Sequence, residues 1–277
     1  MSAAKERYAR HVALFGAEGQ ARVGSSTVVI VGLGGLGCHV AQQLAYLGVR
    51  SFVLLDGDEV TASSLNRLIG ARPADVGTAK VAVGERMIAA IAPDASVLVQ
   101  QEKFDADWQM PSLGRDEVLF GCVDEDPARF QLLRYASAWA LPYLDLAGDV
   151  GDSGAFGGRV VFAKNGERCL HCLGELDRHA LARAEMTEQQ RAADDRIYGV
   201  DRAALAHGGP SVVSINGVVA SLAVTEFMVW RTGLREPAGF LNYRGDLGTV
   251  GRRSDPPRDH CVFCVDRWGS ALPSKHT

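Results

Sequence analysis

A glycine-rich loop between a predicted strand and a predicted helix offers the clearest chemistry in this sequence. Gly32, Gly34, Gly35 and Gly37 follow the apolar run VVIV and precede a helical pattern. Glycines at such a turn let the backbone approach a phosphate closely, and the free N–H groups and positive dipole end of the following helix attract its charge. The loop therefore predicts a nucleotide site, and it suits both NAD and ATP.

Acidic residues follow the next predicted strand. Asp56 lies 19 residues after Gly37, close to the interval at which dinucleotide-binding folds place an acid on a ribose hydroxyl. Asp58 follows in the same loop. We therefore expect Asp56 to bind the ribose, and we include Asp58 among the cofactor-binding residues.

Charged residues beyond this loop distinguish the two nucleotides. Arg67 lies on a predicted loop, Lys80 at a predicted helix start, and Asp124 after another strand of the same sheet. Two cations exceed what a pyrophosphate held by backbone amides needs, but they match the charge that builds on a triphosphate when its α-phosphorus is attacked. A carboxylate at that edge suits Mg²⁺. The set favours ATP and Mg²⁺ over NAD.

Four of the six cysteines form two C-x₂-C pairs. Cys169 and Cys172 make the first pair, Cys261 and Cys264 make the second, and 88 residues separate the two pairs. Two such pairs suit a closed tetrahedral zinc site, which would be structural and would pin the C-terminal tail to the segment after a predicted hairpin. A redox C-x-x-C motif is the alternative for either pair alone. Cys38 and Cys122 lie in apolar contexts, which indicates buried packing.

Composition limits the classes of function. The formal net charge is −4, which gives no electrostatic basis for binding nucleic acid. No uninterrupted apolar run reaches the roughly 18 residues of a membrane span, and the N-terminus lacks the apolar core of a signal peptide. We therefore expect a soluble cytoplasmic protein whose paired cysteines suit a reducing compartment and metal binding.

The elements that must position these residues alternate between strand and helix. The pattern predicts strands over 27–31, 50–55, 96–102, 117–122 and 143–147, and helices over 5–24, 38–47, 79–92, 127–140 and 211–232. A hairpin and further strands follow at 148–169 and 239–250. The fold class is α/β, a Rossmann-like, mostly parallel sheet with helices on both faces and an antiparallel C-terminal part stapled by structural zinc.

We expect residues 1–277 to form a single domain with three parts. Residues 1–26 are a helical lead-in, 27–150 a nucleotide-binding half, and 151–277 a zinc-containing half. The third part includes a charged crossover segment at about 176–209. That segment could be a clamp over an incoming chain or an ordinary surface excursion.

An ordered set of segments carries a family resemblance: RYARH, VGLGGLG, LLDGDEV, SLNR, Lys80, Asp124, the two cysteine pairs and PSVVSINGVVASLAVTEF. Together they span roughly residues 5 to 268 and resemble the ThiF/MoeB/HesA family, bacterial relatives of ubiquitin-activating enzymes. Members of that family use Mg-ATP to adenylate the C-terminal carboxylate of a small ubiquitin-like or sulfur-carrier protein, usually ending in Gly-Gly, and release pyrophosphate.

The resemblance implies roles for individual residues. It places Gly35 and its neighbours at the phosphates, Asp56 at the ribose, and Arg67 and Lys80 on the triphosphate. Asp124 falls near Mg²⁺ and the α-phosphate. Arg10 matches an arginine that acts in trans on the partner's ATP in family homodimers, which implies a homodimer with shared sites.

Three departures from the family pattern affect these expectations. Ser64-Leu65-Asn66-Arg67 stands where relatives commonly have Asn-x-Gln-Arg, so we expect the polar role to fall on Asn66 alone, with Ser64 as a further cofactor-binding residue. Glu125 replaces a common asparagine. The segment between the first cysteine pair and Pro210 contains no cysteine, although relatives that form a thioester carry the acceptor there. We therefore expect the reaction to stop at the acyl adenylate.

Two other functions remain open at this point. An NAD(P)-dependent Rossmann oxidoreductase would use the same glycine loop, but it leaves Arg67, Lys80 and Asp124 unexplained. An inactive, zinc-stapled interaction module is the other alternative, and Glu125 is its only hint.

Overall fold

A computed structural model describes most of the chain. It covers residues 6–105, 108, 117–150, 154–184, 186–187, 190, 211–253 and 261–268. Residues 191–209, which make up most of the predicted crossover segment, lie outside the described residues, as does most of the C-terminal tail.

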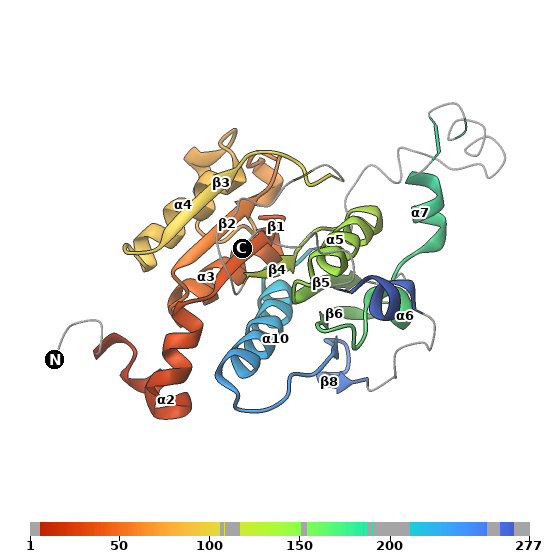
Figure 1. The fold of residues 1–277 in the computed structure, drawn as a ribbon. Helices are drawn as coiled ribbons and strands as arrows, with labels where there is room; N and C mark the ends of the chain where they lie inside the picture. The colour runs from red at the N-terminus through yellow and green to blue at the C-terminus, as the bar shows by residue number, and fades with distance from the viewer. Residues whose placement is uncertain are drawn as a thin grey trace.

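One eight-stranded sheet runs through the molecule in the order β3-β2-β1-β4-β5-β6-β7-β8 (Figure 1). Strands β1 to β5 are parallel, whereas β6, β7 and β8 pair antiparallel with their neighbours. The strands are β1 (Thr27–Val31), β2 (Ser51–Leu55), β3 (Ser96–Gln100), β4 (Glu117–Gly121), β5 (Tyr143–Val150), β6 (Phe156–Ala163), β7 (Phe240–Arg244) and β8 (Thr249–Arg252). The predicted mixed sheet is confirmed.

Helices cover both faces of this sheet. The helices are α2 (Ala9–Gly24), α3 (Gly35–Leu47), α4 (Lys80–Ile91), α5 (Asp126–Trp139), α6 (Leu170–Leu173), α7 (Arg178–Ala184) and α10 (Val213–Thr232). Short turns are η1 (Ala62–Ser64), η2 (Pro73–Asp75) and the π-helical η3 (Val262–Arg267). One core joins α2, α3, α4 and α10 to the sheet, and another joins α5, α6 and η3 to its opposite face.

Strand β1 shows why the sequence folds into these layers. All five of its residues are buried, because a central parallel strand is covered on both faces. Val28 and Ile30 pack into the core under α3 and α10, while Val29 and Val31 pack into the core under α5. A strand that reads as a continuous apolar run therefore divides its side chains between two cores.

Two helices differ most from their predictions, while the other predicted helices begin and end within two residues of them. The first helix of the βαβ unit begins at Gly35, three residues before the predicted start, because the glycine loop itself forms its first turn. The lead-in helix is broken at Gly16, whose φ of 74° and ψ of 167° are not helical. Only a residue without a Cβ adopts that geometry easily, so the predicted single helix is two segments joined at a kink.

Helix α10 is long and apolar enough to span a membrane by length and composition. It has 20 residues and an 18-residue window of mean hydropathy 1.5. In this fold it packs against α2, α3, β5 and β6. Its Glu226 is 2% exposed and pairs with Arg235 at 2.7 Å. Buried core helices of globular domains have this composition as well, so α10 is weak support for a membrane span.

Candidate functional site

The glycine loop lies where the order of the strands reverses. The chain leaves β1 for β2 and β3 on one side and returns to β4 and β5 on the other. Gly32 donates a backbone hydrogen bond to Leu55 at 2.8 Å, and Cys122 donates one to Val31 at 2.8 Å. The loops after β1, β2 and β4 therefore meet at one edge, the position at which open parallel sheets bind ligands.

Each glycine of the loop meets a different environment. A Cβ at Gly32, whose φ is +90°, would lie 2.6 Å from the Cys122 carbonyl oxygen, and one at Gly37 would lie 1.8 Å from the Gly32 oxygen. A Cβ at Gly35 would lie 2.2 Å from the Asn216 Nδ2 atom. At Gly34, by contrast, nothing described lies within 4 Å. Packing explains three of the glycines, whereas Gly34 leaves open space for a ligand.

Asp56 connects the end of β2 to the glycine loop. Its Oδ2 accepts a hydrogen bond from Leu33 N at 2.6 Å, and its Oδ1 accepts one from Asp58 N at 2.8 Å. Burial raises the pKa of Asp56, while Lys80 and these two backbone N–H groups oppose the shift. The carboxylate therefore fixes the shape of the loop, and its side chain is 9% exposed.

Two of the predicted cations lie beside this loop. Lys80, at the start of α4, contacts Asp58 Oδ2 at 2.8 Å, and this hydrogen bond lowers the pKa of Asp58. The Arg67 Cδ atom lies 3.4 Å from the position of a Cβ at Gly35. Arg67 Nη1 donates to the Ser63 carbonyl oxygen at 2.7 Å. Arg67 thus lies against the glycine loop at Gly35, and Lys80 lies beside the acidic loop that follows β2.

Ser64 and Asn66 shape the loop that carries Arg67. Ser64 is buried, and its hydroxyl accepts from Thr61 N at 2.9 Å and donates to the Thr61 carbonyl oxygen at 2.8 Å. Its own carbonyl oxygen accepts from Arg67 N at 3.1 Å. Asn66 is exposed, and its Oδ1 accepts from Arg67 Nη1 at 3.2 Å. In this structure both residues contact protein groups that orient Arg67.

Asp124 lies on the turn between β4 and α5. The side chain is exposed, and the preceding turn packs on the glycine loop, with Val123 N 3.3 Å from the position of a Cβ at Gly32. Glu125 is the N-cap residue of α5, but its side chain makes no capping hydrogen bond. The structure therefore brings Asp124 to the same edge as the glycine loop, Asp56 and Lys80.

The sequence reasoning missed two residues at this edge. Asn216 of α10 is 3% exposed, packs against Gly35, and donates from Nδ2 to Ser211 Oγ at 3.0 Å. The sequence could have indicated Asn216 only as a polar residue within an apolar helical pattern. Lys103 follows β3, lies against Gly57, and acts electrostatically on Asp58 to lower its pKa. An isolated surface lysine gives no signal of this kind in the sequence.

Arg10 is exposed on α2, at the opposite end of α3 from the glycine loop. Near it, Tyr8 lies against Gly48, which caps the C-terminal end of α3, and Arg7 donates a hydrogen bond to the Ile91 carbonyl oxygen at the end of α4. Helix α3 has 13 residues, or about 20 Å at the usual rise. The start of α2 projects from the body of the molecule there (Figure 1).

The four paired cysteines form one buried cluster. Their Sγ atoms all lie within 4.8 Å of one another. Separations are 3.7 Å for Cys169–Cys172, 3.6 Å for Cys169–Cys261 and 3.8 Å for Cys172–Cys264. With zinc–sulfur bonds of about 2.3 Å, the edges of a tetrahedron measure about 3.8 Å. The donor set therefore fits a structural zinc ion.

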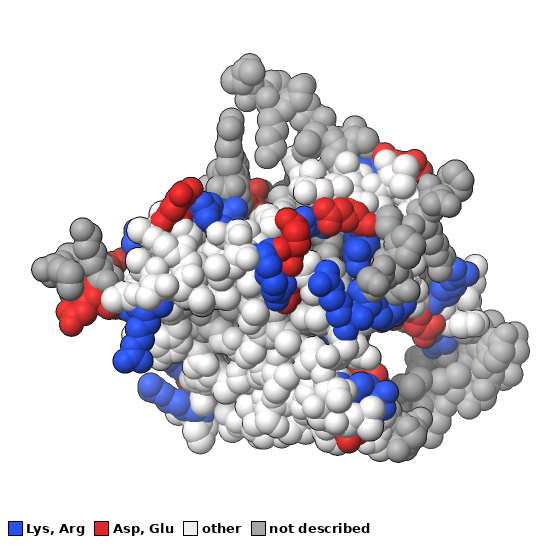
Figure 2. Space-filling model, turned by 90° about the horizontal axis from the view of Figure 1, so that it is seen from below, with Lys and Arg blue, Asp and Glu red and all other residues white. Residues whose placement is uncertain are grey.

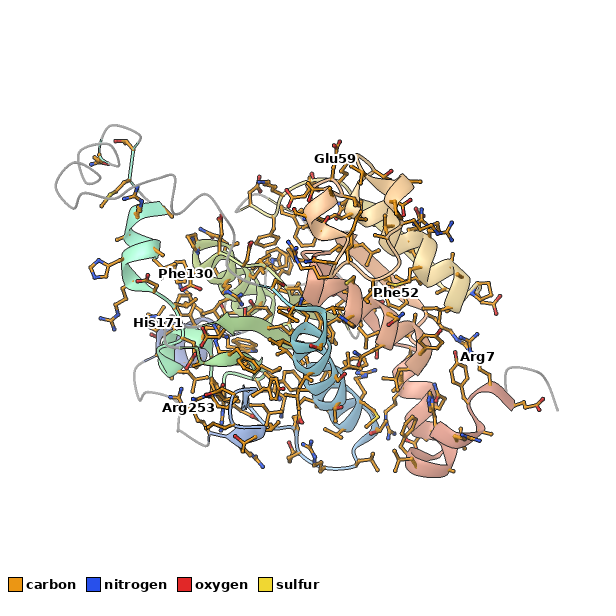
Figure 3. All side chains as sticks on the ribbon, turned by 180° about the vertical axis from the view of Figure 1, so that it is seen from behind. Arg7, Phe52, Glu59, Phe130, His171 and Arg253 are labelled. Atoms are coloured by element: carbon orange, nitrogen blue, oxygen red, sulfur yellow. The ribbon has the colours of Figure 1, made fainter. Side chains whose placement is uncertain are left out.

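The electrostatics of this cluster also favour a cation. Contacts with neighbouring thiols raise the pKa of Cys169 and of Cys264, so four thiolates need a positive ion at their centre. His171 packs on Phe263 with ring centroids 5.5 Å apart, as does Phe130 at 5.6 Å. Figure 3 shows Phe130, His171 and Arg253 on one side of the molecule and Glu59 far from them. The cysteine cluster and the glycine loop are separate sites.

Comparisons with known proteins agree with this arrangement. The family model described as ThiF family matches residues 8–265. The chain is 36% identical over 129 residues to the SAMP-activating enzyme E1 of Haloferax volcanii, covering 46% of this chain and 48% of that protein. It is 29% identical over 239 residues to the sulfur carrier protein ThiS adenylyltransferase of Escherichia coli, covering 85% and 84%.

A crystal structure of E. coli MccB with ATP shares the fold. Its TM-score is 0.72 at 19% identity, covering 93% of this chain and 74% of that chain. The chain spans about half the length of several of the curated relatives that it matches, because those proteins are longer.

Proposed function

The chain belongs to the ThiF family, and we propose that it is an ATP-dependent adenylyltransferase that activates the C-terminal carboxylate of a small ubiquitin-like or sulfur-carrier protein. One observation carries the proposal. Among the described residues, the glycine loop is closely packed at Gly32, Gly35 and Gly37 but open at Gly34, and Arg67 lies against Gly35. Lys80 pairs with Asp58, next to the Asp56 carboxylate that holds the loop. This arrangement suits a triphosphate.

The chemistry needs alignment of two ligands rather than a covalent nucleophile. A carboxylate oxygen of the carrier attacks the α-phosphorus of ATP, the bond from that phosphorus to the oxygen bridging to the β-phosphate breaks, and pyrophosphate leaves with that oxygen. Arg67 and Lys80 neutralise the charge that develops on the leaving group. Mg²⁺, when bound, adds positive charge at the phosphates. Asp124 is the residue that would hold it.

The curated relatives support a carrier protein as substrate, since their names include a ThiS adenylyltransferase and a SAMP-activating enzyme. A Gly-Gly terminus belongs to the same proposal. Two residues without side chains let the chain approach the glycine loop closely, which is the physical reason to expect them at the reacting end.

The state of the cysteines supports a reaction that stops at the acyl adenylate. Burial raises the pKa of the Cys38 thiol to about 11, and burial raises the pKa of the Cys122 thiol as well. Both therefore lack the thiolate that attack on an adenylate requires. The other four cysteines of the chain form the buried cluster. All six cysteines are therefore buried in structural positions, and none offers a reactive thiolate for a thioester.

A homodimer in which Arg10 acts in trans is part of the proposal. Arg10 lies at the end of α3 away from its own glycine loop, so it can serve a site only on another chain. Val12, Leu14 and Tyr46 are exposed nearby on α2 and α3. Figure 2 shows a broad area of one face that carries no Lys, Arg, Asp or Glu side chains.

Mixing two inactive variants tests action in trans. A dimer of one Arg10→Ala chain and one Asp124→Ala chain should regain about one active site, because the second chain supplies the arginine and the first supplies the carboxylate. The measurement is adenylate formation by the mixture against each variant alone. No recovery in a mixture shown to contain heterodimers would contradict the role in trans.

We extend the proposal to a single cytoplasmic domain. The sheet is continuous from β3 to β8 and joins the glycine loop to the cysteine cluster, which supports one folding unit over 1–277. All six cysteines are free thiols in the structure, as in proteins of a reducing compartment.

Pyrophosphate exchange into ATP tests the function directly. Exchange that depends on a carrier ending in Gly-Gly, and that stops when this tail is removed, is the expected result. Tight NADH binding without exchange would favour the NAD(P)-dependent oxidoreductase. Binding of the carrier with neither nucleotide binding nor exchange would favour the inactive, zinc-stapled interaction module.

A further inference from the structure

A buried ion pair lies under the turn that carries Asp124. Arg129 of α5 is 4% exposed and Asp145 of β5 is fully buried. Arg129 Nη1 donates to Asp145 Oδ1 at 3.0 Å and to Oδ2 at 2.9 Å. Burying two charges is costly unless both are paired and hydrogen-bonded. Because this pair lies beside the turn that follows β4 and carries Asp124, it could also hold that turn in place.

Arg129 uses the rest of its guanidinium group to hold the turn. Its Nη2 donates a hydrogen bond to the Val123 carbonyl oxygen, and its Nη1 also donates to the Leu146 carbonyl oxygen at 2.8 Å. Its Nε lies 3.5 Å from Asp126 Oδ1. The Val123 carbonyl belongs to the peptide that joins Val123 to Asp124. Arg129 therefore fixes the peptide from which the Asp124 side chain projects.

Asp145 is in turn held from other directions. It accepts hydrogen bonds from Arg159 Nη1 at 2.6 Å and from the Tyr143 hydroxyl at 2.9 Å. Burial alone would raise the pKa of Asp145, but the guanidinium groups of Arg129 and Arg159 outweigh it and keep the pKa below its usual value. Asp145 is therefore a carboxylate at neutral pH, and its position is fixed on several sides.

The same network reaches the half that contains the cysteine cluster. Arg159 Nε pairs with Glu175 Oε2 at 3.0 Å, and Arg253 Nη1 pairs with Glu175 Oε1 at 2.6 Å. Glu175 follows Cys172 by three residues. The segment after the first cysteine pair thus braces, through Arg159, the carboxylate that holds Arg129.

We propose that Arg129 and Asp145 are positioning residues of the nucleotide site, which hold the Val123–Asp124 peptide so that the Asp124 carboxylate faces a metal-bound nucleotide. This inference rests on the proposed role of Asp124. A guanidinium fork is needed because a lysine carries the charge but cannot bind the carboxylate and two carbonyl groups in a fixed plane. If the pair only stabilised the fold, its loss would lower stability without changing the metal dependence of nucleotide binding.

Arg129→Lys in the full chain tests the proposal, with Arg235→Lys as the matched control. Arg235 also binds a buried carboxylate with two hydrogen bonds, to Glu226 Oε1 at 2.7 Å and to Glu226 Oε2 at 2.8 Å. Glu226 lies in the C-terminal half of α10, away from the Asn216 end that packs on the glycine loop. Calorimetry with ATP, with and without Mg²⁺, is the measurement. We expect Arg129→Lys to weaken Mg-ATP binding by about 10- to 100-fold, the usual cost of losing a group that supports a metal ligand.

Metal-free ATP should bind Arg129→Lys within about twofold of the wild type, and Arg235→Lys should leave both affinities within the same limits. Unchanged Mg-ATP affinity in a folded Arg129→Lys protein would overturn the proposal. Equal weakening with and without Mg²⁺ would also overturn it, because the effect would then not pass through the metal-binding carboxylate.

A double-mutant cycle with Asp124→Asn tests whether Arg129 acts through Asp124. Once the carboxylate is lost, Arg129→Lys should weaken Mg-ATP binding by less than a further factor of about two. Independent, multiplying effects would overturn the positioning role.

Tyr143→Phe provides a milder variant if Arg129→Lys does not fold. It removes one hydrogen bond to Asp145 and leaves every charge in place, so it should weaken Mg-ATP binding in the same direction but less. No change would count against the proposal. All of these measurements are made without a carrier protein, so a failure of carrier-dependent exchange sinks the proposed function alone. Absence of Mg-ATP binding by the wild-type chain would overturn both.

Discussion

The two halves of the sheet carry different kinds of site. Beside β1 to β5, the candidate nucleotide site consists largely of backbone that follows the strand ends. Beside β6 to β8, the candidate metal site consists of four thiols from two distant segments. Three of the loop glycines are required by close packing. The cysteine cluster instead lies among short elements, α6 and η3, which have four and six residues.

This difference shows what each half depends on. Parallel strands with helices on both faces bury enough apolar surface to fix their loops without a cofactor. Short elements bury less apolar surface, so we expect a metal ion at the cysteine cluster to supply the missing stability. A chain of ion pairs that runs from the buried Arg129 to the exposed Arg253 joins the two halves. Four predictions break or sharpen this comparison, ordered by their expected effect on stability.

Loss of zinc should have the largest effect. Structural zinc sites contribute on the order of 10 kcal/mol of apparent binding free energy in small domains. We expect metal analysis to find about one zinc ion per chain, as four thiolates imply, and Cys264→Ser to lose it. The second half should then be cut first in limited proteolysis. A zinc-free, reduced wild-type protein with unchanged thermal stability would contradict the four-cysteine site.

Asp145→Asn should have the next largest effect, because it leaves Arg129 and Arg159 without their buried counter-charge. Breaking a buried pair in this way costs about 3–5 kcal/mol. The pKa of Asp145 is lower in the folded protein than its ordinary value, so its contribution is complete above the unfolded pKa and is lost as the pH falls through the folded one.

Denaturant unfolding of wild type and Asp145→Asn as a function of pH measures this. The difference in the free energy of unfolding should be constant at neutral pH and should shrink below a pH of about 4, the ordinary pKa of an aspartic acid. A gap that widens on acidification would show that Asp145 is not ionised in the folded protein.

Two glycine variants separate packing from ligand access in the first half. Gly37→Ala places a Cβ 1.8 Å from the Gly32 oxygen, and overpacking of this kind costs about 3 kcal/mol. The Cβ of Gly34→Ala has no described atom within 4 Å, so this variant should leave thermal stability nearly unchanged but weaken ATP binding by obstructing the phosphate. Thermal unfolding and calorimetry check both. Normal ATP affinity in Gly34→Ala would show that the opening is not the phosphate site.

Arg67→Ala and Lys80→Ala should affect stability least and activity most. Lys80 pairs with an exposed carboxylate, Asp58, and surface pairs are worth about 1 kcal/mol or less. Loss of a charge that stabilises the leaving group should lower pyrophosphate exchange by about 100-fold or more. The controls are the thermal midpoint and circular dichroism of each variant. Near-normal exchange in either would mean that the pocket is assigned wrongly.

Local patterns predicted the parallel half of the fold well. The predicted strands at 27–31, 50–55, 96–102 and 117–122 correspond to β1 to β4, within two residues at each end. Buried parallel strands show as apolar runs, and glycines between a strand and a helix show as a turn, so both leave a signal within about 30 residues. The cysteine cluster was also predicted, because thiol pairs with this spacing have few other uses in such a protein.

Contacts between distant segments were decided by the tertiary structure. Asn216 lies against Gly35, and Arg129, Asp145 and Arg159 form one charge network across α5, β5 and β6. In the sequence each of these residues is a single polar residue within an apolar or mixed pattern. The order of the strands brings them together, and partner charges then make their burial possible.

The sequence by itself thus determined which residue types are available at the strand ends and in the cysteine pairs. Only the tertiary structure decided which of the loop glycines are covered: Asn216 of α10 packs against Gly35, whereas nothing in the described part of the chain lies within 4 Å of a Cβ at Gly34. Spacing along a chain fixes local backbone geometry, whereas packing between elements fixes which atoms a ligand can reach.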